Sequence, residues 1–304
     1  MACQSCRRQL TLLARQANTF AEIQNIQSVT AIQHFTPHTL KIQPPSLSQK
    51  RGFSNTPRQL GIRETLAKVF SQTAEPYRIV SATEAIYKTC AAEALYTIPE
   101  KDRKNDTIKK TAEGEDIGDG NTMWHEDFKL QPTFSTWSQV TMLHLYLVFA
   151  RLRNLERDNA RAWQRQLVDH FFFDMETRMG LMHGISSRGL RHRYLKDIFI
   201  QWRGAIAAYD EGVIKGDPVL AAAVWRNIFK GREDVDVRSV AAIVSWMRLC
   251  LKMLDQIPDE ALHLQTQAVF KWPAKNELVL VDKPVKELHD LLAHTPPPVH
   301  KVAL

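Results

Sequence analysis

Two runs of apolar residues at helical spacing, separated by a glycine-rich break, dominate the stretch between residues 163 and 212. In the first run, large apolar side chains recur every four positions and mark one buried stripe of a helix, at Leu167, Phe171, Met175 and Met179. The second run places apolar side chains on one face of another helix, at Leu195, Ile198, Trp202, Ala205 and Tyr209. The helical pattern is interrupted between them by Gly180, Gly184 and Gly189. The stretch therefore predicts a helical hairpin with an apolar seam.

A column of charge runs beside this seam. Lys196, Arg203 and Asp210 follow one another at seven-residue intervals, which keeps them on one side of a helix. We predict that these residues and their neighbours bind partner proteins, and we call the set the ionic flank: Asp174, Glu176, Arg178, Lys196, Arg203, Asp210 and Glu211. The alternative is that the same side chains form internal salt bridges that tie the hairpin to adjoining helices.

Three arginines cluster in the break before the second helix, at Arg188, Arg191 and Arg193. Clustered guanidinium groups suit the phosphates of ribosomal RNA or of anionic lipid, so a contact of this kind is a hypothesis for the cluster. Solvated surface charge is the simpler interpretation of the same residues.

Helical patterns also account for most of the remaining chain. Alternating strand patterns of useful length are missing between residues 54 and 270. We therefore predict an all-α fold, with a single helical domain of about six or seven helices and flexible N- and C-terminal extensions. The helical body should cover residues 133–262 and begin with a helix that Thr133 or Ser135 caps.

The segments around this body have different compositions. Residues 54–132 should hold N-terminal helices, at 57–70 and 77–96, the second starting after a proline. Residues 100–122 are rich in charge and glycine, which predicts a mobile polar linker that cannot offset the entropy of ordering. The proline-containing residues 263–304 predict an extended tail. Within it, residues 275–286 could form one brief extended segment.

Residues 1–53 differ from the rest in charge. They contain six basic residues and one acid, and so account for most of the net charge of +7. An Arg-rich, acid-poor, amphipathic start predicts a mitochondrial targeting presequence, with cleavage expected after Phe53. The remainder is nearly balanced in charge, which argues against DNA as a partner. The pair Cys3 and Cys6 lies inside this presequence and lacks a second zinc pair, so we interpret it as coincidental.

The longest apolar run, Val140–Ala150, is too short to cross a bilayer and contains His144. It is typical of a buried helix. Any membrane association of the chain is therefore expected to be peripheral or through a partner.

One group of side chains suggests chemistry. His170 and Asp174 are four residues apart and share a helix face, with Glu176 close by. A metal- or haem-handling enzyme that uses these three residues is the alternative function for the chain. A metal site needs further ligands that the spacing does not supply, and a solvated helix pair is the simpler interpretation. Because no phosphate-binding loop, GxSxG or HExxH motif accompanies them, we expect no cofactor and no catalytic residues.

Several ordered segments of the hairpin resemble one protein family, the ubiquinol–cytochrome c chaperones. The segments that carry the resemblance are Asp174-Met175-Glu176, Tyr194-Leu195-Lys196-Asp197, Gln201-Trp202-Arg203-Gly204 and Ala208-Tyr209-Asp210-Glu211-Gly212, with Phe134–Val140 and Arg151–Arg153 upstream. The resemblance covers roughly residues 133–262. Glu176 departs from the aspartate that the family pattern has there, which preserves the charge.

The resemblance implies a role in assembling the cytochrome bc1 complex, respiratory complex III. Its implied partners are newly synthesised cytochrome b, a small complex III assembly factor that forms a heterodimer with the chaperone, and the mitochondrial ribosome. Its implied location is the matrix side of the inner membrane. These are expectations from the resemblance, with which the helical patterns are compatible.

Overall fold

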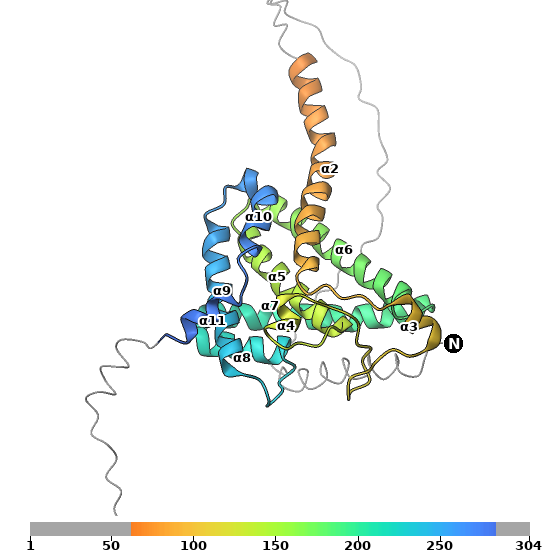
Figure 1. Ribbon diagram of the computed structural model, residues 1–304. Helices are drawn as coiled ribbons and strands as arrows, with labels where there is room; N and C mark the ends of the chain where they lie inside the picture. Colours follow the sequence, from red (N-terminus) through yellow and green to blue (C-terminus); the bar gives the residue numbers. More distant parts are fainter. Residues whose placement is uncertain (1–61, 284–304) are drawn as a thin grey trace, which may run out of the picture.

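The computed structural model describes the backbone of residues 62–283, with side chains from Tyr77 onward. The predicted presequence at 1–53 and the tail beyond residue 283 lie outside the described residues. Within them the all-α prediction is confirmed, with more helices than the six or seven expected (Figure 1). The helices are α2 (Ile62–Ala92), α3 (Glu100–Asn105), α4 (Met123–Glu126), α5 (Phe134–Leu152), α6 (Arg157–Leu181), α7 (Arg188–Lys215), α8 (Asp217–Ile228), α9 (Val237–Asp255), α10 (Leu262–Phe270) and α11 (Asn276–Val281).

Helix α5 lies at the centre of the body. Of its 19 residues 17 are buried, because α2, α6, α7, α8 and α9 all pack against it. Thr133 caps it as predicted, with its side-chain oxygen accepting a hydrogen bond from the backbone N–H of Thr136. The apolar run Val140–Ala150 is thus a buried helix. No helix among residues 62–283 combines the length and the apolar character needed to span a bilayer.

The predicted hairpin is α6 followed by α7. Its expected stripe, including Phe171 and Met175, is buried in α6. The chain turns at Gly184, whose positive φ of 63° suits a residue without a Cβ, and Ser187 caps α7. The break is shorter than predicted, since Gly180 and Gly189 lie within the two helices.

The prediction of two separate helices at 57–70 and 77–96 is wrong, because α2 runs as a single helix from Ile62 through Pro76. A proline removes one backbone hydrogen bond but did not end this helix. In Figure 1 the N-terminal half of α2 projects clear of the other helices. Its C-terminal half lies parallel to α6, since Thr83 contacts His170 and Tyr87 contacts Asp174 at the same sequence separation of 87.

The segment at 100–122 is predicted from its composition to be a mobile polar linker, but it has regular structure and contacts on the body. It contains α3 and two isolated antiparallel bridges, and it packs on the body. Two of its acids are buried and paired: Glu115 with Lys230 at 2.9 Å and Asp116 with His183 at 3.1 Å. The reason is that these charges find partners on distant elements, which a local composition cannot show.

The tail prediction is wrong for residues 263–283, which form most of α10 and all of α11. Residues 276–281, expected to be extended, are helical because α11 packs on α9. The buried carboxylate of Glu277 accepts hydrogen bonds from Ser245 on α9, at 2.6 Å, and from the Trp272 indole, at 3.3 Å. These bonds anchor the C-terminal helices to the body.

Candidate functional site

The first part of the ionic flank lies at the contact between α2 and α6. The Asp174 carboxylate accepts hydrogen bonds from the Tyr87 hydroxyl, at 2.6 Å, and from Nε of Arg178, at 3.0 Å. The Arg178 guanidinium also stacks over the Trp137 ring, 4.1 Å from its centroid. Burial, and next the Asp174 charge, raise the pKa of Tyr87 far above its usual value, so the hydroxyl remains a donor. Asp174 and Arg178 therefore lock α2 and α5 onto α6.

Other acids of the flank are paired within the molecule as well. Glu176 accepts a hydrogen bond from Arg191 at 3.2 Å across the hairpin. Asp210 accepts a bidentate pair from Arg153, at 2.7 and 3.0 Å, which joins α7 to the end of α5. Glu211 pairs with Lys215 one turn along α7, at 2.6 Å. Of these three acids, only Asp210 ties the hairpin to an adjoining helix, as the alternative interpretation of the sequence describes; Glu176 is paired within the hairpin and Glu211 within α7.

Lys196 and Arg203 are different, because both are exposed and neither makes an ion pair among the described residues. They lie on the outward side of α7, where Phe199 and Ile200 stand between them with exposed fractions of 43% and 52%. The same side continues along α7 with further exposed residues at helical spacing. We call the outer stripe Ile200, Gly204, Ala207, Glu211 and Ile214.

The arginine cluster divides in the same way. Arg191 is held by the backbone carbonyls of Ile185 and Ser186, at 2.9 and 2.8 Å, and by Glu176, so it fixes the turn of the hairpin. Arg188 and Arg193 are exposed on the first turns of α7. These two remain candidates for contact with a polyanion.

The structure does not bring together the side chains of the alternative metal site. His170 faces α2, where its Nε2 lies 3.2 Å from the Thr83 hydroxyl. Asp174 is occupied by Tyr87 and Arg178, whereas Glu176 points to α7. Among the described side chains, those of residues 77–283, no three His, Cys, Asp or Glu gather around a point that could hold a metal ion.

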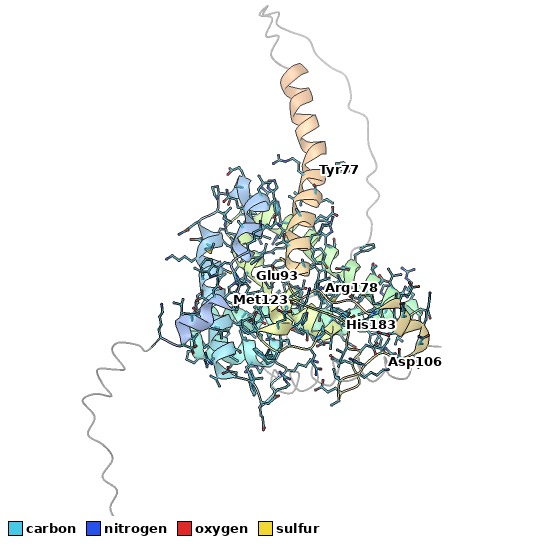
Figure 2. The ribbon with its side chains drawn as sticks, viewed as in Figure 1. Tyr77, Glu93, Asp106, Met123, Arg178 and His183 are labelled. Atoms are coloured by element: carbon cyan, nitrogen blue, oxygen red, sulfur yellow. The ribbon has the colours of Figure 1, made fainter. Side chains whose placement is uncertain are left out.

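The sequence patterns did not reveal two sets of polar side chains that lie close together inside the body. The Tyr96 hydroxyl and Nε2 of His183 are 2.7 Å apart, and Nδ1 of His183 lies 3.1 Å from Asp116. His183, labelled in Figure 2, follows the end of α6. Near the centre of the body, Nε2 of the fully buried His144 is 4.0 Å from the Glu93 carboxylate. No motif marks these pairs, because each joins residues far apart in the chain.

Burial perturbs the titration of the second pair in opposite directions. It raises the pKa of Glu93 to about 7 and lowers that of His144 to about 4. The hydrogen bond from Nδ1 of His144 to the Val140 carbonyl, at 2.8 Å, opposes the change at the histidine. Both groups are therefore neutral over a common range of pH below 7.

Comparison with known proteins identifies the family of the chain. The profile of a family described as ubiquinol-cytochrome C chaperone matches residues 126–270. The ubiquinol-cytochrome-c reductase complex assembly factor 1 of Xenopus laevis is 32% identical over 161 residues, which cover 52% of this chain and 78% of that protein. The chain belongs to the ubiquinol–cytochrome c chaperone family.

Two further known proteins are similar to this chain. Protein CBP3, mitochondrial, of Saccharomyces cerevisiae is 39% identical over 147 residues, or 48% of this chain. The match spans 44% of the yeast protein, so less than half of that relative is represented. The crystal structure of the Cbp3 homolog from Brucella abortus aligns with a TM-score of 0.47 at 20% identity, covering 65% of this chain and 92% of that one.

Proposed function

We propose that this chain is a mitochondrial chaperone that assists assembly of complex III, ubiquinol–cytochrome c reductase. The observation that carries the proposal is the family membership, together with the match over 78% of an assembly factor for that complex. The yeast relative's name supports the mitochondrial location, and the targeting character of residues 1–53 agrees with it.

The client in this proposal is newly synthesised cytochrome b, held together with a small partner assembly factor near the mitochondrial ribosome, on the matrix side of the inner membrane. Cytochrome b exposes apolar helices that aggregate unless they are covered. A helical body with exposed apolar side chains covers such helices without any chemical step. The paired acids of the ionic flank support this role indirectly. Glu176 ties α6 to α7 and Asp210 ties α7 to the end of α5, whereas Lys196 and Arg203 remain accessible.

Contact with the ribosome or with anionic lipid falls to the exposed Arg188 and Arg193. The double variant Arg188→Ala, Arg193→Ala leaves the structural Arg191 in place. Its binding to mitochondrial ribosomes and to cardiolipin vesicles should weaken, with a shallower dependence on salt, when measured at two salt concentrations. Unchanged binding to both would remove these arginines from the proposal.

Removal of the gene tests the function itself. We expect complex III activity and cytochrome b absorbance to fall together in mitochondria without the chain, while succinate dehydrogenase activity is maintained as the control. The wild-type gene should restore both, and a gene without codons 1–53 should do so only when another targeting sequence is attached. Normal complex III in the mutant would reject the proposed function.

A further inference from the structure

The outward side of α7 carries both large apolar side chains and very small ones. Ile200 and Ile214 are 52% and 83% exposed, and their separation of 14 positions corresponds to about 21 Å along a helix. Between the two isoleucines the outer stripe carries the small exposed residues Gly204 and Ala207. The stripe thus has an apolar projection toward each end and a low waist in the middle.

The fold itself does not require glycine at position 204. A Cβ there would meet nothing within 4 Å, and Gly204 is not among the glycines with positive φ. Glycine in a helix interior destabilises the helix relative to alanine. By contrast, a Cβ on Gly212 would lie 2.5 Å from Cα of Leu220, so that glycine is required by the packing of α8. The waist at Gly204 therefore leaves room for another backbone to approach closely.

The charge next to the waist limits what can approach. Arg203 and Lys196 are exposed without an ion pair among the described residues. The acids of α7 do not neutralise them: Asp210 is held by Arg153 and Glu211 by Lys215, and Asp197 makes no ion pair with either base among the described residues. An occupant that buries this side of α7 must therefore bring its own negative charge.

We propose that the outer stripe docks an apolar α-helix of the client that crosses α7 at Gly204 and Ala207 and places a carboxylate beside Arg203. This inference rests on the proposed function and names the binding surface for it, with a transmembrane helix of new cytochrome b as the occupant. Small residues at a crossing let two helix backbones come close, which increases their van der Waals contact. Ile200 and Ile214 then pack along the two sides of the crossing helix, and Arg203 fixes its direction.

Two other occupants fit the relief less well. A flat bilayer surface would rest on the two isoleucines and leave the waist at Gly204 unfilled. A second copy of the chain, related by a two-fold axis at the waist, would set Arg203 against Arg203. An apolar helix with one carboxylate meets both the shape and the charge.

Photo-crosslinking in mitochondria tests the assignment. A benzophenone amino acid replaces Ala207, or as a control the 71% exposed Leu264 on α10, and mitochondrial translation products are labelled with radioactive methionine. We expect an adduct with labelled cytochrome b from position 207 and none from position 264. An adduct with lipid or with a second copy, or none at all, would overturn the assignment. Labelled cytochrome b that fails to co-purify even with the wild-type chain would instead reject the proposed function, and the assignment with it.

A set of glycine variants gives a second, quantitative test. Gly204→Leu fills the waist, Gly204→Ala adds one methyl group, and Gly180→Leu makes the same change at another helical glycine with open space around it. We expect Gly204→Leu to reduce co-purified cytochrome b about tenfold, as loss of a central contact does, and the other two to stay within about twofold of wild type. None of the three should lower the melting temperature. Retention of the client by Gly204→Leu would contradict the proposal.

Discussion

Asp174 distinguishes an internal salt bridge from a partner-binding residue most clearly. Its carboxylate is the acceptor for Tyr87, a residue only 6% exposed, and for Arg178, whose side chain is 15% exposed. The change Asp174→Ala removes both bonds at once. It leaves the Tyr87 hydroxyl without an acceptor in the interface between α2 and α6, and it frees one side of the guanidinium above Trp137.

The expected cost follows from these contacts. A buried donor left without an acceptor costs roughly 1–3 kcal/mol. The ion pair is partly exposed and so adds about 0.5–1 kcal/mol. We therefore expect Asp174→Ala to reduce the free energy of unfolding by about 1.5–4 kcal/mol. A loss of this size lowers the melting temperature of a domain of this size by roughly 3–16 °C.

Denaturant unfolding and thermal melting of the purified chain measure this change. Asp174→Asn retains an oxygen that can accept from Tyr87 and should cost about half as much. The double variant Tyr87→Phe, Asp174→Ala should cost less than the sum of the single variants, because no orphaned donor is left. A loss below about 0.5 kcal/mol for Asp174→Ala, together with reduced client binding, would refute the structural interpretation and return Asp174 to the interface.

Three further variants have expected outcomes. Glu93→Gln should raise the free energy of unfolding at pH 8. In the wild-type chain the Glu93 carboxyl has a pKa raised to about 7, so it is protonated in the folded state at lower pH. Its contribution to the free energy of unfolding is therefore lost as the pH rises from about 4.5 to 7. In the Glu93→Gln variant the free energy of unfolding should instead rise with pH between about 4 and 6.5. The reason is that His144, with a pKa lowered to about 4 in the folded state, binds a proton more readily in the unfolded chain over this range. A pH profile like that of the wild type would contradict this. Gly212→Ala should destabilise by about 1–3 kcal/mol in denaturant unfolding, because its Cβ meets the backbone at Leu220. Arg203→Glu should leave the melting temperature unchanged and weaken client capture, and a collapsed melting temperature would show a structural role.

The sequence was sufficient for the architecture of the hairpin because that information is local. A period near four residues at Leu167, Phe171 and Met175 defines a buried stripe whatever the stripe packs against. The cap at Thr133 is equally local, since its acceptor and the N–H of Thr136 are three residues apart. Such features need no knowledge of the tertiary fold.

The pairings of the ionic flank could not be predicted in the same way. Asp174 meets Tyr87 because α2 and α6 lie parallel in one register, and Asp210 meets Arg153 because α5 ends beside α7. Nothing in the charge pattern of α7 separates the engaged Asp210 from the exposed Arg203. Segment 100–122 shows the same limit, because its buried acids are stabilised by partners just beyond the ends of α6 and α8.

Pulse-labelling of mitochondrial translation followed by isolation of the tagged chain tests the central claim most directly. The account predicts that labelled cytochrome b is recovered with the chain immediately after the pulse, and that it leaves during the chase as complex III forms. Recovery of no labelled translation product, in mitochondria that still assemble complex III at the normal rate, would contradict the account.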